Sequence, residues 1–131
     1  MSARPGVAAR RSKRGRLSRS AEFDRVFRQG RSIANRVLVL YAFPRAEEGE
    51  PRLGLSVSKR VGGAVERNHV KRLLREAFAH ESSGLPDGVD IVVVARPEAR
   101  VVAESDGLDG IRAALAELIG RARERAAGER R

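Results

Sequence analysis

The sequence contains no cysteine and no tryptophan, and its aromatic side chains are four phenylalanines and one tyrosine. The absence of cysteine excludes disulfide bonds and thiolate metal sites, and it makes a reducing cytoplasmic setting the default expectation. No apolar run approaches the roughly 18 residues that a membrane-spanning helix needs, so no membrane partner is expected. With 131 residues the chain can bury one modest core, which predicts a single domain.

Carboxylates are also few relative to cations, with 17 Asp and Glu against 27 Lys and Arg and a formal net charge of +10. This excess favours a polyanionic partner, and nucleic acid is the leading candidate. A basic protein of membrane surfaces would normally add an amphipathic helix with large exposed apolar residues. The charge balance therefore predicts a nucleic-acid-binding protein.

Positive charge is concentrated at the start of the chain, because residues 1–20 hold seven cations and no carboxylate. This composition, together with Pro5 and Gly6, argues against a packed element. An organelle transit peptide has a similar composition, but the apolar face of a targeting helix is missing here. We expect a disordered basic arm over residues 1–18, one folded domain over residues 19–124 and a basic tail over residues 125–131.

The segments that follow the arm predict a short helix and a strand. Ser20 can cap a helix that Gly30 ends, with Phe23 and Phe27 on its apolar face. The run "RVLVLYAF", residues 36–43, is rich in β-branched and aromatic residues and predicts a strand. Its alternation puts Tyr41 on one face with Val37 and Val39, opposite Leu38, Leu40 and Ala42.

The run "RLGLSVSK", residues 52–59, predicts a second strand because its apolar residues alternate strictly with small ones. One face of this strand carries only glycine and serine, at Gly54, Ser56 and Ser58. Such a face can be a neutral solvated surface, or it can let the backbone of another molecule approach the sheet closely. Two cations, Lys59 and Arg60, follow at once and favour the second interpretation.

The stretch "AVERNHVKRLLREAF", residues 64–78, predicts a helix with two distinct faces. Its apolar residues repeat at helical spacing and form a core-facing stripe of Val70, Leu73, Leu74, Ala77 and Phe78. A second set of side chains forms a cationic ridge that consists of Arg67, Asn68, Lys71, Arg72 and Arg75. Like charges four residues apart destabilise an isolated helix by a few tenths of a kcal/mol per pair. Because a solvated face commonly mixes signs, the ridge predicts a track for phosphate groups.

The order of these motifs resembles that of the protein subunit of bacterial ribonuclease P, from about Leu17 to Ala122. The family signature Arg-Asn-x-x-Lys-Arg-x-x-Arg-Glu is matched by Arg67, Asn68, Lys71, Arg72, Arg75 and Glu76. The segment "DIVVVARPEA" is similar to the last strand of the family and its exit. One departure is Gly63, which stands where the family often has Asn and which weakens side-chain capping of the signature helix.

The resemblance implies an α+β fold in a single two-layer domain. A four-stranded, mostly antiparallel sheet would be combined with three helices, and its last strand would cover residues 91–95. The signature helix would lie in a left-handed β-α-β crossover, although the general rule predicts the opposite hand. The closing helix is also predicted by apolar spacing after possible caps at Ser105 or Asp106. Its apolar residues are Leu108, Ile111, Leu115, Leu118, Ile119 and Ala122.

The resemblance further implies the accessory protein subunit of an endoribonuclease ribonucleoprotein. A catalytic RNA would cleave the 5′ leader from precursor tRNA, and Mg2+ would be held mainly by that RNA. The protein itself would have no catalytic residues, no metal site and no obligate protein partner. His69 and His80 agree with this, because neither has a cysteine partner or an evident ligand spacing.

Two sets of RNA-binding residues follow from the resemblance. Those expected to bind the catalytic RNA are Arg67, Asn68, Lys71, Arg72 and Arg75. Those expected to bind the leader are Phe23, Phe27, Tyr41, Ser56, Lys59 and Arg60, although plain core packing is the alternative for the two phenylalanines. A ribosomal or general RNA-binding protein, or a DNA-binding helix module, would explain the charge, but neither predicts the ordered signature.

Overall fold

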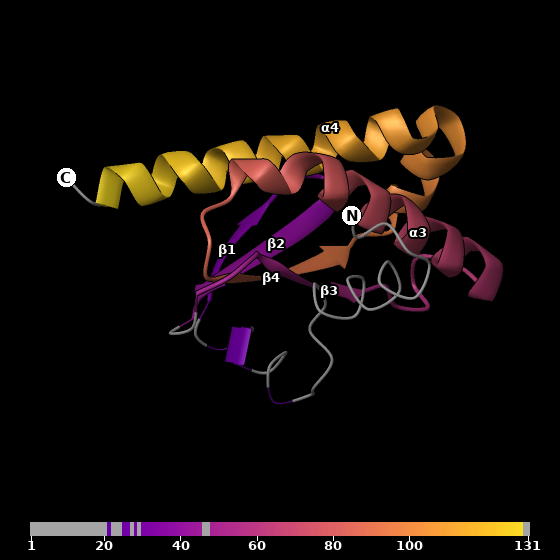
Figure 1. The fold of residues 1–131 in the computed structure, drawn as a ribbon. Helices are drawn as coiled ribbons and strands as arrows, with labels where there is room; N and C mark the ends of the chain where they lie inside the picture. Colours follow the sequence, from indigo (N-terminus) through magenta and orange to yellow (C-terminus); the bar gives the residue numbers. More distant parts are fainter. Residues whose placement is uncertain (1–20, 22–24, 27, 29, 46–47, 130–131) are drawn as a thin grey trace, which may run out of the picture.

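The computed structural model describes residues 21, 25–26, 28, 30–45 and 48–129 (Figure 1). Its strands are β1 (Arg31–Ala34), β2 (Leu38–Pro44), β3 (Arg52–Ser56) and β4 (Val89–Ala95). Its long helices are α3 (Ala64–Glu81), which continues into a 3-10 turn at Ser82–Gly84, and α4 (Glu98–Glu129). No helix in these ranges is long and apolar enough to cross a membrane. The basic arm expected over residues 1–18 lies outside the described residues.

The four strands form one sheet in the order β1-β2-β4-β3. β2 pairs antiparallel with both β1 and β4, whereas β3 pairs parallel with β4. The sheet is therefore mixed, and the expectation of a mostly antiparallel sheet is wrong. The reason is that α3 carries the chain from the end of β3 back to the start of β4, so these neighbours run in the same direction. The left hand expected for this crossover stays a prediction.

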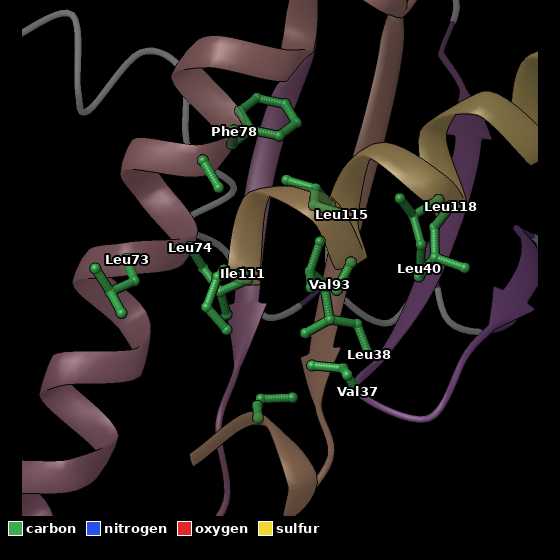
Figure 2. Close-up of a cluster of buried hydrophobic side chains, with 14 of the residues drawn as sticks. Val37, Leu38, Leu40, Leu73, Leu74, Phe78, Val93, Ile111, Leu115 and Leu118 are labelled. Atoms are coloured by element: carbon green, nitrogen blue, oxygen red, sulfur yellow. The ribbon is translucent and has the colours of Figure 1, made fainter. Parts of the chain in front are cut away.

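α3 and α4 lie side by side on one face of the sheet (Figure 1). Alternate strand residues point into this layer, among them Leu38, Leu40, Leu53, Ile91 and Val93. The closing helix contributes Ile111, Leu115, Leu118 and Ile119, at the spacing that its sequence predicts. Figure 2 shows Leu74 beside Ile111 and Leu118 beside Leu40, so both helices contribute to one core.

α4 begins earlier than expected, at Glu98, and is interrupted at Gly107. Gly107 has φ 63° and ψ −144°, a conformation that glycine reaches at little cost because it has no Cβ. The second helical segment starts after this break and corresponds to the closing helix expected after Ser105 or Asp106. Leu108 and Ala122 pack against the core as partly buried residues.

The helix expected before residue 30 falls mostly on residues outside the described part, which holds two long helices rather than the three expected. Arg25, Val26 and Arg28 are helical. Gly30 ends this segment as predicted: its N–H donates to the carbonyl oxygen of Val26 at 2.8 Å, and a Cβ at this position would lie 2.4 Å from the same oxygen. Val26 is fully buried against Val92, on the face of the sheet opposite α3 and α4.

Candidate nucleic-acid interface

α3 separates the two sets of side chains that its sequence distinguishes. The core-facing stripe is confirmed, because the buried residues of α3 are Val70, Leu73, Leu74, Ala77 and Phe78. The members of the cationic ridge lie off this stripe. Asn68, Arg72 and Arg75 are exposed, and Arg67 and Lys71 are half-buried. Burial of the stripe therefore decides which way the ridge faces.

Two ridge cations contact groups other than carboxylates. Nη1 of Arg67 donates to the carbonyl oxygen of Gly62 at 3.0 Å, which ties this side chain to the turn before α3. Nη2 of Arg72 lies 3.0 Å from Nδ1 of His69. Neither contact adds a negative charge, so both guanidinium groups keep their charge for a phosphate partner. Gly63 provides no side-chain cap for α3, as expected for glycine at this position.

The face of the sheet opposite α3 and α4 carries the small residues of β3, and we call it the second face. The strand register aligns Gly54, Val92 and Tyr41 in one row across β3, β4 and β2. The next row contains Ser56, Val94 and Val39. Tyr41 and Ser56 are both half-buried, and they are separated by the β4 strand, or about 10 Å across the sheet. The structure thus brings two of the expected leader-binding residues onto one face.

The alternation predicted for Tyr41 is confirmed, except at Val37. Tyr41 packs beside Val92 in a small cluster that is separate from the main core. Val37 was expected on the same face, but it is buried in the main core. The physical reason is a turn in which Oδ1 of Asn35 accepts hydrogen bonds from the N–H groups of Val37 and Leu38, at 3.0 and 2.8 Å. β2 begins only at Leu38, so Val37 does not follow the alternation of the strand.

The connection from β3 to α3 joins the second face to the ridge. The strand expected through residue 59 ends earlier, at Ser56, and Lys59 and Arg60 lie exposed in the turn that follows. Val61, only 2% exposed, anchors this turn in the core. The two cations therefore lie between the second face and the start of the ridge. Phe23 and Phe27, the other expected leader-binding residues, lie outside the described residues.

A buried ion cluster on the second face was not indicated by the sequence analysis. Asp90 is fully buried, and its carboxylate accepts hydrogen bonds from Nη1 of Arg45 at 3.0 Å and from Nε and Nη2 of Arg52 at 2.8 and 2.9 Å. Arg25 lies 4.0 Å from the same carboxylate and stacks over the ring of Phe43, 5.4 Å from its centroid. The sequence feature that could have predicted this cluster is Asp90 itself, a lone carboxylate in an apolar strand. Such a group is rarely buried without cationic or hydrogen-bonding partners.

Both histidines lie on α3, and His69 contacts Arg72 of the ridge. His69 is half-buried and His80 is exposed near the end of α3. Among the residues that the structure describes, no group of three or more His, Cys, Asp or Glu side chains is placed to hold a metal ion. The chemistry that the described surface offers is charge, hydrogen-bond donors and an aromatic ring.

A ridge of cations on α3 and, joined to it through the turn after β3, a sheet face with small residues and a tyrosine suit the phosphates and unpaired bases of RNA. The fold and this surface together define an α+β RNA-binding protein. The sequence matches the ribonuclease P family over residues 12–123, and the chain belongs to this family. The ribonuclease P protein component of Brevibacillus brevis is 42% identical over 108 residues, which cover 82% of each chain. That of Bacillus pumilus is 47% identical over 87 residues, 66% of this chain and 73% of the relative.

Solved structures of the same family share the fold. A mutant Staphylococcus aureus RNase P protein with defective mRNA degradation activity has a TM-score of 0.81 and 34% identity, over 92% of this chain and 98% of the other. The RNase P protein of Thermotoga maritima has a TM-score of 0.72 and 31% identity, over 81% of this chain and 96% of the other. The α+β architecture around a four-stranded mixed sheet is therefore the architecture of the family.

Proposed function

We propose that this chain is the RNA-binding protein subunit of a ribonuclease P ribonucleoprotein, in which a catalytic RNA removes the 5′ leader from precursor tRNA. The observation that carries the proposal is the geometry of α3. Burial of its apolar stripe turns the family signature away from the core as one cationic ridge. The family match over residues 12–123 supports the same assignment. We place this subunit in the cytoplasm, where a bacterial ribonuclease P is expected.

The ridge is proposed to bind the catalytic RNA. Its cations neutralise phosphates and release the counterions condensed on the RNA, which favours association. The amide of Asn68 adds a donor and an acceptor for phosphates or for hydrated metal ions. Mg2+ is proposed to be held mainly by the RNA. Cations supplied by the protein reduce the repulsion between two polyanions, so less magnesium is needed.

The second face and the turn after β3 are proposed to bind the leader. Ser56 is small and half-buried, so it lets an RNA strand approach the sheet closely, whereas Gly54 is buried. Tyr41 supplies a ring for base stacking. Lys59 and Arg60 neutralise leader phosphates, and Phe23 and Phe27 are expected to complete the site. Because mature tRNA lacks the leader, the precursor binds better than the product, and the product is released.

Cleavage is expected to require the RNA subunit. The protein alone should not cleave precursor tRNA, because a catalytic role is proposed for the RNA and not for any side chain. Adding the cognate RNA at low magnesium should restore release of the 5′ leader, measured on a gel with protein alone, RNA alone and both together. Robust magnesium-dependent cleavage by RNA-free, nuclease-free protein would overturn the proposal.

The RNA that copurifies with the protein provides an independent check. Sequencing should identify one abundant structured RNA, the catalytic subunit. Recovery of ribosomal RNA instead would favour a ribosomal or general RNA-binding protein, and a mixture of DNA fragments would favour a DNA-binding module.

Tyr41→Ala is expected to weaken binding of precursor tRNA to the reconstituted holoenzyme by about 1–3 kcal/mol, the contribution of one stacked base. Binding of mature tRNA should not change, because no leader base is present to stack. The measurement is a pair of titrations, one with each tRNA. Tyr41→Phe is the matched control and should retain the affinity, since it keeps the ring.

A structural role for Tyr41 would give a different result. An equal loss for both tRNAs, or a large fall in the melting temperature of the free Tyr41→Ala protein, would show that Tyr41 supports the fold and that the leader binds elsewhere.

A further inference from the structure

The outer edge of β1 is occupied by arginines from α4. β1 is an end strand of the sheet, and such a strand presents carbonyl groups that no neighbouring strand uses. Nη1 of Arg121 donates to the carbonyl oxygen of Ala34 at 3.0 Å, and Nη1 of Arg125 donates to that of Ser32 at 3.2 Å. Both bonds can form together because the two distances match. Arg121 and Arg125 are separated by a helical rise of about 6 Å, and Ser32 and Ala34 by a strand rise of about 6.8 Å.

A third arginine lies beyond Arg121 at the same edge of the sheet. Nη1 of Arg96, which follows β4, donates to the carbonyl oxygen of Asn35 at 3.2 Å. We call Arg96, Arg121 and Arg125 the edge arginines. All three are exposed, and they lie at successive points beside β1. They belong neither to the ridge on α3 nor to the turn after β3.

The edge arginines keep most of their positive charge available. Their backbone partners are neutral carbonyl groups, and one such bond uses one of the five donors of a guanidinium. Arg121 lies 3.9 Å from a carboxylate oxygen of Glu117, but both side chains are about half exposed, at 47% and 56%. An ion pair between such exposed side chains is weak, so Glu117 neutralises little of the charge of Arg121. Arg112, by contrast, lies 3.0 Å from the Glu81 carboxylate and is neutralised there.

The position of these arginines connects them to the second face. Ser32 pairs with Tyr41, so it lies at the β1 end of the row that contains Tyr41. The Ser32 carbonyl oxygen is the one that accepts the hydrogen bond from Arg125. Ala34 pairs with Val39, so the carbonyl that holds Arg121 ends the row that contains Ser56. Val92, in the middle of the Tyr41 row, is fully buried under Val26, whereas Ser56, Val94 and Val39 in the next row are only half-buried. An RNA strand that follows this second row from β3 toward β1 therefore leaves the sheet at the edge arginines, beside Arg121.

We propose that Arg121 and Arg125, aided by Arg96, form a phosphate-binding extension of the leader site that receives the nucleotides upstream of those on the second face. This inference rests on the proposed function and adds a preference for longer leaders. A protein strand is a poorer occupant of this edge, because the carbonyl groups it would need are already bonded to arginine. The positive charge and the continuity with the second face both favour the RNA leader.

The test compares leader lengths in the reconstituted holoenzyme. Precursor tRNA with a leader that ends on the second face is titrated beside precursor tRNA with a leader several nucleotides longer, and beside mature tRNA. Wild type should bind the longer leader more tightly. In the double variant Arg121→Gln, Arg125→Gln, this gain should disappear, and the slope of log affinity against log salt for the longer leader should fall by about 1.4, or 0.7 for each lost phosphate contact. The shorter leader and mature tRNA should be unaffected.

Two further variants control for charge and for folding. Arg123→Gln removes the same charge from the same helix, but Arg123 lies beside Gly84 and away from β1, so it should leave the leader-length effect intact. Arg121→Lys with Arg125→Lys keeps both charges and should restore most of the salt dependence, even if the bonds to β1 are weakened.

Several outcomes would overturn the inference. One is a wild-type holoenzyme that gains no affinity from the longer leader, and another is a loss in the glutamine variant that is equal for all three ligands. Weaker binding of the catalytic RNA by this variant would assign the edge arginines to that RNA. A holoenzyme that still prefers precursor over mature tRNA would leave the proposed function intact in each case. Failure of that preference in wild type would reject the proposed function itself.

Discussion

Asp90→Ala is expected to lower the free energy of unfolding of the free protein by about 3–5 kcal/mol. The carboxylate is fully buried, and its removal would leave Arg45, whose side chain is only 6% exposed, and the partly buried Arg52 without their common partner. An uncompensated buried charge is far more costly than the loss of a surface pair. Because domains of this size are stable by about 5–15 kcal/mol, the effect should be plain in urea or thermal unfolding.

Glu104→Ala is the matched control for this prediction. Glu104 also pairs with an arginine, Arg100, at 3.4 Å, but both side chains are about half exposed, at 56% and 45%. Its removal should cost less than about 1 kcal/mol. Similar losses for the two variants would show that the Asp90 cluster does not stabilise the fold.

Lys71→Ala combined with Arg72→Ala is expected to weaken binding of the catalytic RNA roughly a hundredfold. The estimate takes about 1.5 kcal/mol for each charge-assisted contact. The slope of log affinity against log salt should fall by about 1.4–1.8, because each phosphate contact contributes 0.7–0.9. Filter binding or fluorescence titration over a series of salt concentrations measures both quantities.

The fold should tolerate this double variant. Neither residue belongs to the buried stripe of α3, and alanine favours helix while removing like-charge repulsion. The melting temperature should therefore stay the same or rise slightly. Arg123→Ala removes an exposed cation from α4 and should change the RNA affinity much less. An unchanged affinity and salt slope in the double variant would mean that the ridge is an ordinary solvated face.

α3 and its ridge were determined by the sequence alone. Five apolar residues repeat at helical spacing, and the structure buries the same five. Helical periodicity is a local property, so assigning one face to the core also assigns the cations to the other side, without reference to any other element. The alternation of strand residues likewise predicted which face of the sheet carries Tyr41 and Ser56. It failed only at Val37, because a turn formed by the Asn35 side chain displaces this residue from the strand. The ordered signature on the ridge was enough to indicate the family.

Only the tertiary structure decided how the strands pair and which charges meet. β1 has four residues, too few for an alternation that would predict a strand, and β3 lies parallel to β4 because of the path that α3 takes between them. The bonds from Arg45 and Arg52 to Asp90 span 45 and 38 residues, and those from Arg121 and Arg125 to β1 span 87 and 93. No local pattern encodes such contacts, since they depend on which strands become neighbours and on where α4 crosses the sheet. The ridge could therefore be found from its own residues, whereas the Asp90 cluster and the edge arginines required the packed fold.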